Sequence, residues 1–201
     1  MNVYVESNFV LELALLQEQH ASCEEMVRLG EAGHIQLVTP AYSLAEPYET
    51  LTRRHRQRKR MKAELDVELR QLARTTTYAH RLSGFQQLTT VLIESADEEA
   101  KHLEEVCARL VQVAEVIPLA SGLLIAATQY QHTYHLSPQD ALVYAAVLGH
   151  LQQHQAIQSC FLNRNAKDFD DPDLVEELDR HNCKLLPRFD AGYQFVLSCL
   201  P

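Results

Sequence analysis

The sequence lacks several features that would assign it to a familiar class of protein. Its most apolar stretch, residues 116–127, is too short to cross a membrane and is interrupted by Pro118. No positively charged segment precedes the first apolar residues, so we expect no signal peptide. The five cysteines form no CxxC motif and the ten histidines no HExxH motif, so we expect reduced thiols and scattered histidines rather than zinc ligands. We therefore expect a cytoplasmic protein with no membrane contact.

The charged residues are unevenly placed. The net charge is −9, yet residues 53–62 hold seven of the 18 Lys and Arg side chains and no acid. A basic patch on an acidic protein is typical of a local contact with a polyanion such as RNA. A solvated helix face, or a surface for an acidic protein partner or a second protomer, is the alternative. The candidate nucleic-acid contacts are Arg53, Arg54, Arg56, Arg58, Lys59 and Arg60.

The order of elements predicts an α/β fold. The chain has no repeat or low-complexity linker, and its length suits one domain, which we assign to residues 1–201. Short apolar strands alternate with longer helices, as they do in a parallel sheet with helical crossovers. The expected strands cover residues 2–6, 35–38, 159–162 and 184–186, with 194–197 as a weaker edge-strand candidate.

The middle of the chain is predicted to be helical. We expect a helix with Pro40 at its first position and a kink at Pro47. Apolar residues recur at helical spacing over residues 65–72 and again over 103–113. These stripes predict a helical hairpin over about residues 50–115 that projects from the sheet or caps it. The 103–113 stripe is typical of a core or helix-pairing face, and we consider it as an exposed surface for a homo-oligomer.

Four acidic residues fall where strands end or helices begin. Glu6 ends the first strand, Glu46 lies in the helix after the second, Asp140 opens the helix before the third, and Asp168 follows that strand. Ligands of parallel sheets bind at the carboxyl ends of the strands, and buried acids are rare unless paired or metal-bound. Carboxylates suit Mg²⁺, which activates water in phosphodiester hydrolysis. Convergence of the four acids would make such a site.

The sequence around these acids resembles the PIN domain family. The family's first strand ends in Asp followed by small polar residues, and here residues 3–8 read Val-Tyr-Val-Glu-Ser-Asn. A Glu after the second strand corresponds to Glu46, and an Asp-Ala pair at the start of a late helix corresponds to Asp140 and Ala141. The last motif, a strand followed by Thr-x-Asp or Thr-x-Asn and then Asp-Phe, corresponds to residues 161–169.

This resemblance spans most of the chain and implies a fold, an activity and partners. The fold would be a three-layer α/β sandwich, a small parallel sheet flanked by helices with a long helical insertion. The activity would be hydrolysis of RNA through carboxylate-bound Mg²⁺ or Mn²⁺. An antitoxin protein is an implied partner, since the family includes toxins of toxin–antitoxin pairs, and many members form homo-oligomers. The implied catalytic metal ligands are Glu6, Glu46, Asp140 and Asp168, with Asn8 and Asn165 beside them.

Two departures from the family pattern leave a second hypothesis open. Glu6 stands where the family has Asp and reaches about 1.5 Å further, one carbon–carbon bond. Asn165 stands at the usual Thr-x-Asp position, so the last acidic ligand falls to Asp168, with Asp171 as a weaker candidate. Because Mg²⁺ is strict about ligand position, the chain is either a nuclease or a catalytically weakened PIN-like binding or regulatory module.

Each acid also has a structural explanation. Asp140 with Ser137 resembles a capping box, and an acid there favours the helix dipole. Glu6 is placed to cap the following helix or to pair with a lysine, and Glu46 to lie on a solvated helix face. Asp168 is one of several acids in a polar loop. Only the convergence of the side chains separates these explanations from a metal site.

Overall fold

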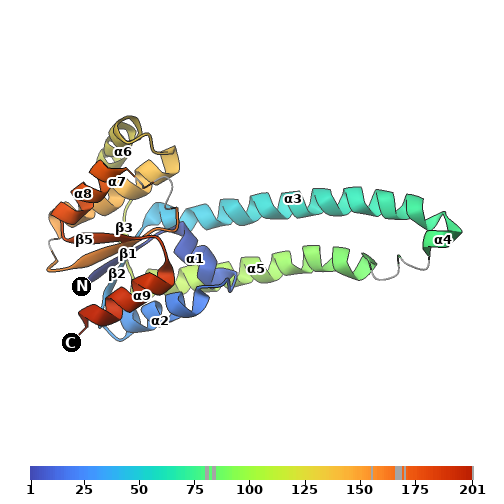
Figure 1. Ribbon diagram of the computed structural model, residues 1–201, viewed down its shortest axis with the longest axis horizontal. Coiled ribbons are helices and arrows are strands. Elements are labelled where there is room, and N and C mark those ends of the chain that lie inside the picture. The colour runs from blue at the N-terminus through green and yellow to red at the C-terminus, as the bar shows by residue number, and fades with distance from the viewer. Residues whose placement is uncertain (80–81, 83–84, 155, 166–168, 170, 201) are drawn as a thin grey trace.

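A five-stranded parallel sheet forms the centre of the molecule (Figure 1). The computed structural model describes residues 1–79, 82, 85–154, 156–165, 169 and 171–200. The strand order is β3-β2-β1-β4-β5, so the first strand of the chain is the middle strand of the sheet. The carboxyl ends of β1, β2 and β4 therefore lie side by side. The strands are β1 (Asn2–Val5), β2 (Gln36–Pro40), β3 (Glu115–Ile117), β4 (Ser159–Leu162) and β5 (Cys183–Leu186).

Helices cover both faces of this sheet. One buried cluster joins the sheet to α1, α2, α5 and α9, and a second joins it to α6, α7 and α8 (Figure 1). The predicted α/β architecture, a small parallel sheet between helical layers, is confirmed. The helices are α1 (Ser7–Ala14), α2 (His20–Glu31), α3 (Ala41–Ala73), α4 (Thr76–Ala79), α5 (Phe85–Val113), α6 (Ser121–Thr133), α7 (Pro138–Gln153), α8 (Pro172–Arg180) and α9 (Phe189–Cys199).

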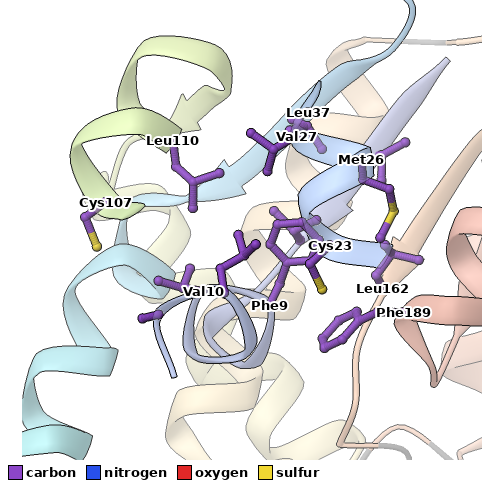
Figure 2. Close-up of a cluster of buried hydrophobic side chains, with 14 of the residues drawn as sticks. Phe9, Val10, Cys23, Met26, Val27, Leu37, Cys107, Leu110, Leu162 and Phe189 are labelled. Carbon is purple, nitrogen blue, oxygen red and sulfur yellow. The ribbon is translucent and has the colours of Figure 1, made fainter. Parts of the chain in front are cut away.

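The alternation of side chains along each strand explains the two clusters. Val3 and Val5 face the first cluster, whereas Tyr4 between them faces the second. Both faces of β1 are buried, which is why its sequence is a continuous apolar run. In the first cluster Phe9 of α1 meets Phe189 of α9 edge to face, with ring centroids 5.5 Å apart (Figure 2). These contacts fix the start of α1, and thus the residues that follow β1.

Helices α3 and α5 form a long hairpin that extends away from the sheet (Figure 1). Leu51 of α3 is buried at the base of this hairpin. Further out, Nη1 of Arg58 donates hydrogen bonds to the carboxylate of Glu99 at 2.9 and 3.0 Å and to Oγ of Ser95 at 3.1 Å. Arg58 therefore holds the two helices together. Within the described part of the chain, every helix is too short or too polar to span a bilayer.

Two expectations from the sequence were wrong. The 103–113 stripe is not exposed, because Leu103 and Leu110 are buried against the sheet and α1 (Figure 2 shows Leu110). Residues 194–197 lie in α9 rather than in a strand, since a short apolar run does not distinguish the two by itself. The sequence analysis also missed β3, which has only three residues. Helix α3 begins at Ala41, one residue later than expected, because Pro40 ends β2.

Candidate acidic site at the sheet edge

A cavity of about 460 Å³ lies at the carboxyl edge of the sheet, where β1, β2 and β4 end. Three of the predicted acids, Glu6, Glu46 and Asp140, line it together. They come from segments far apart in the sequence: the start of α1, the second turn of α3 and the first turn of α7. The other predicted residues on its walls are Asn8, Asn165, Arg53 and Arg54. The fourth predicted acid, Asp168, lies outside the described residues.

Glu6 is a buried carboxylate at the N-cap of α1. Its Oε2 accepts a hydrogen bond of 2.8 Å from the backbone N–H of Asn8. Its Oε1 is buried and has no hydrogen-bond partner in the described part of the structure. Burial raises the pKa of Glu6 to about 7, and the nearby Glu46 carboxylate raises it further, although hydrogen bonds from Asn8 and from the backbone of Arg164 act to lower it. A buried carboxylate with one open oxygen requires either a proton or a cation.

Glu46 is held in place by Ser7, a residue whose contact the sequence analysis did not anticipate. Oγ of Ser7 donates a hydrogen bond to Oε2 of Glu46. Because Ser7 directly follows Glu6, this bond links the acid after β1 to the acid on α3. In the sequence, the signal for this contact was the hydroxyl residue Ser7 directly after Glu6. Its partner, Glu46, depends on the position of α3, which the sequence does not give.

Asp140 lies in the first turn of α7, beside the N-cap residue Ser137, and also lines the cavity. Its backbone N–H donates to Oγ of Ser137 at 3.1 Å, and Oγ of Ser137 donates in turn to Oδ2 of Asp140. Nδ2 of Asn165 also donates to the Asp140 carboxylate, at 3.3 and 3.4 Å. Ser137 therefore caps α7 through the N–H of Asp140, which is one half of the expected capping box, and this cap is compatible with a place for Asp140 in the site. These bonds fix the rotamer of Asp140 and leave it on the cavity wall.

The loop after β4 is anchored by an ion pair between a buried acid and a partly exposed arginine, which was not predicted from the sequence. Glu12 of α1 is fully buried, and Nη1 of Arg164 lies 2.6 Å from its Oε2. Arg164 stands between Asn163 and Asn165, and Oδ1 of Asn163 accepts a 2.8 Å hydrogen bond from the backbone of Asn165. A single acid within the apolar run of α1 was the signal for a buried partner. The pair keeps the asparagine loop against the cavity.

The donor set suits a hard divalent cation. Three carboxylates line this cavity with amide and hydroxyl groups, and all of them offer oxygen, the atom that Mg²⁺ and Mn²⁺ prefer. Among the described residues their oxygens do not all come within 4.8 Å of one another, so a bound ion would have to draw the three side chains together. The unpartnered Oε1 of Glu6 is the observation that a bound cation would explain. Glu6, Glu46 and Asp140 are thus the residues that could hold the ion. Arg53 and Arg54 on the same wall place positive charge where an anionic substrate would approach.

The basic segment lies on α3 and begins at this cavity. Arg56, Lys59 and Arg60 are exposed further along the helix. Arg53, Arg56 and Arg60 share a second, shallow hollow with Tyr48. Arg58 instead faces α5 and Glu99. The remaining side chains of the segment therefore form a basic surface that continues from the acidic cavity along the hairpin.

Comparisons with known proteins place the chain in a family. Residues 3–169 match the family model described as PIN domain. No curated protein matches the chain. One similar solved structure is titled "Crystal structure of VapBC2 from Rickettsia felis bound to a DNA fragment from their promoter". It is 9% identical, with a TM-score of 0.44, and the alignment covers 92% of this chain and 98% of that chain.

Proposed function

This chain belongs to the PIN domain family, and we propose that it is a ribonuclease that hydrolyses RNA phosphodiesters with the help of a carboxylate-bound Mg²⁺ or Mn²⁺. The observation that carries the proposal is the convergence of Glu6, Glu46 and Asp140 on one cavity beside Arg53 and Arg54. Carboxylates with adjacent cationic side chains suit a substrate that carries phosphates.

Each residue has a distinct part in this proposal. Glu6, Glu46 and Asp140 would hold the cation, which when bound lowers the pKa of a water and neutralises charge on the phosphate. Ser7 keeps Glu46 oriented, and Ser137 with Asn165 does the same for Asp140. Arg53 and Arg54 would bind the phosphate backbone on either side of the cleaved bond. Asp168 is proposed as a fourth acidic ligand, as its motif implies.

An RNA cleavage assay tests the proposal. Purified protein with Mn²⁺ or Mg²⁺ is expected to cleave single-stranded RNA, and chelation with EDTA should stop the reaction. Asp140→Asn keeps the size and capping capacity of the side chain but removes its charge, and we expect a loss of activity of at least about 100-fold. The matched control is Asp97→Asn on the exposed side of α5, which should cleave like the wild type. Equal activity of Asp140→Asn and wild type would contradict the proposal.

The second candidate function is a PIN-like module that binds partners without cutting RNA. The observation that favours it is Glu6 in place of the family's Asp, because the longer side chain changes where a cation can sit. Calorimetry with Mn²⁺ separates the two candidates. Binding in the micromolar range supports the enzyme, whereas no heat at millimolar Mn²⁺ supports the module.

We extend the proposal to protein partners. The hairpin carries exposed apolar side chains, which soluble surfaces normally keep apart or use for contacts. They support a homo-oligomer or an antitoxin protein as the partner of this chain. Size-exclusion chromatography tests the first, and co-purification with the product of an adjacent gene tests the second. The exposed apolar residues are Met61, Leu65, Val67, Leu72 and Val91.

A further inference from the structure

A second group of metal-ligating side chains lies away from the acidic cavity. Glu115 of β3 meets His150 of α7 and His154 just beyond its last turn. One ligand atom of each residue lies within 4.8 Å of the other two. His150 is ten residues further along α7 than Asp140, which separates the two groups by about 15 Å along the helix axis. The two clusters are therefore distinct.

In both histidines Nδ1 makes a hydrogen bond, which leaves Nε2 available. Nδ1 of His154 donates to the backbone carbonyl of His150 at 3.3 Å, since a carbonyl oxygen only accepts. Nδ1 of His150 lies 2.9 Å from the hydroxyl of Tyr4, which accepts or donates by rotation. Metal-bound histidines usually make such a bond through the second nitrogen, which fixes the ring and its tautomer. Nε2 is thus free to bind a cation in both residues.

The contact between His150 and Glu115 also suits a cation bound between them. Nε2 of His150 is 3.1 Å from Oε1 of Glu115, yet the nitrogen is buried and makes no aligned hydrogen bond in the described structure. Two polar atoms that lie this close without an aligned hydrogen bond are placed like two ligands of one cation. His150 is 7% exposed, so its nitrogen has little access to bulk water. The ring of His154 stacks on that of His150, with centroids 4.1 Å apart and planes 14° apart. Because the two rings are nearly parallel, the exposed ring of His154 must turn before both Nε2 atoms can point at one ion.

We propose that Glu115, His150 and His154 form a Zn²⁺ site with one open coordination position. Two imidazoles and one carboxylate are a donor set that zinc uses, and Mg²⁺ disfavours imidazole. Histidines four residues apart share one face of a helix, which brings both rings to the same ion. The open position faces a cavity of about 480 Å³ lined largely by apolar side chains of β3, α6 and α7. Residues 150–154 read His-Leu-Gln-Gln-His, so the two histidines have the spacing of an HExxH motif but Leu151 stands at the Glu position.

The site would connect the edge of the sheet to the helix that covers it. β3 has three residues, and within the described residues β2 is its one strand partner, so β3 is an edge strand. A cation that binds the folded protein but not the unfolded chain stabilises the folded state, by an amount that grows with the logarithm of the cation concentration above its Kd. The zinc would therefore secure the short strand directly after the hairpin helix α5.

Calorimetric titration with Zn²⁺, read together with thermal unfolding, tests this site. The wild type should bind zinc and unfold at a higher temperature with it. His154→Gln should weaken this binding by about tenfold or more, and Glu115→Gln should act in the same direction. His181→Gln is the matched control, because His181 caps α8 as His154 caps α7.

A further variant separates this site from the acidic cavity. Asp140→Asn should retain the zinc binding that His154→Gln loses, and the ¹⁵N chemical shift of Nε2 in His150 should move on zinc addition. The proposal is overturned by zinc binding that survives in both His154→Gln and Glu115→Gln, by zinc binding that Asp140→Asn abolishes, or by no binding at millimolar zinc.

Discussion

At the scale of single residues, Glu6 has several roles in the candidate acidic site. It ends the central strand, caps α1 and keeps one carboxylate oxygen buried without a partner in the part of the chain that the structure describes. Burial raises its pKa to about 7, so near neutral pH the metal-free site is poised between a protonated and an ionised form. A cation in the cavity would favour the ionised form and release the proton.

The raised pKa of Glu6 predicts how metal-free stability depends on pH. Its pKa is about 7 in the folded protein and 4.5 as the reference value, so the folded state holds a proton that the unfolded chain has lost between these values. The proton on Glu6 stabilises the folded protein fully below pH 4.5, and this stabilisation is lost as the pH rises through 7. Glu6→Gln removes this loss. The variant minus wild-type difference in free energy of unfolding should therefore be about 1–3 kcal/mol larger at pH 8 than at pH 5.

Urea unfolding in EDTA at these two pH values measures the difference. Glu98→Gln, on the exposed side of α5, is the control and should show no such pH-dependent gain. If Glu6→Gln changes the free energy of unfolding by the same amount at pH 5 and pH 8, burial does not raise the pKa of Glu6 in the folded protein.

At the scale of elements, the sequence predicted those segments whose local pattern matches their environment. β1, β2 and β4 are apolar runs because both of their faces are buried. β3 was missed because three residues carry no periodicity, and α9 was mistaken in part for a strand because its apolar residues were judged over too short a window. For the candidate site, the motif order selected Glu6, Glu46 and Asp140, which the structure places on one cavity. The anchoring pair of Glu12 and Arg164 depends on long-range packing that no local pattern encodes.

The packing of α9 on β4 gives a prediction about a glycine. A Cβ added at Gly192 would lie 2.5 Å from Cδ2 of Leu162, a fully buried side chain of β4. Gly192→Ala should therefore destabilise the protein by about 1–3 kcal/mol, because Leu162 must move within a filled core. Gly149→Ala in α7 is the matched control, since nothing lies within 4 Å of its added Cβ. It should stabilise the protein by about 0.5–1 kcal/mol in the same urea assay. Equal stability of the two variants would contradict this packing.

The basic surface of α3 gives a prediction about RNA binding. Loss of a phosphate contact lowers the dependence of log affinity on log salt by about 0.7 for single strands. The double variant Arg53→Ala with Arg54→Ala should therefore bind single-stranded RNA more weakly and with a shallower salt dependence, measured by fluorescence anisotropy in EDTA. Arg74→Ala, at the far end of α3, should match the wild type. An unchanged slope in the double variant would exclude these two residues as phosphate contacts.

At the scale of the whole molecule, the topology explains why the acids meet. The chain places its first strand in the middle of the sheet and the strands that follow on either side of it. The segments after β1, β2 and β4 are brought to one edge, and α7 begins at the same edge with Asp140. The long hairpin carries the basic surface outward from this point (Figure 1). The arrangement joins a candidate catalytic cavity to a candidate track for an RNA strand.

The central claim is that Glu6, Glu46 and Asp140 together hold one divalent cation. A crystal soaked in Mn²⁺ and measured at a wavelength where manganese scatters anomalously tests it most directly. The account predicts an anomalous peak in the cavity at bonding distance from all three carboxylates, and its loss in Asp140→Asn. A cavity without a peak at millimolar Mn²⁺, or a peak that none of the three carboxylates contacts, would contradict it.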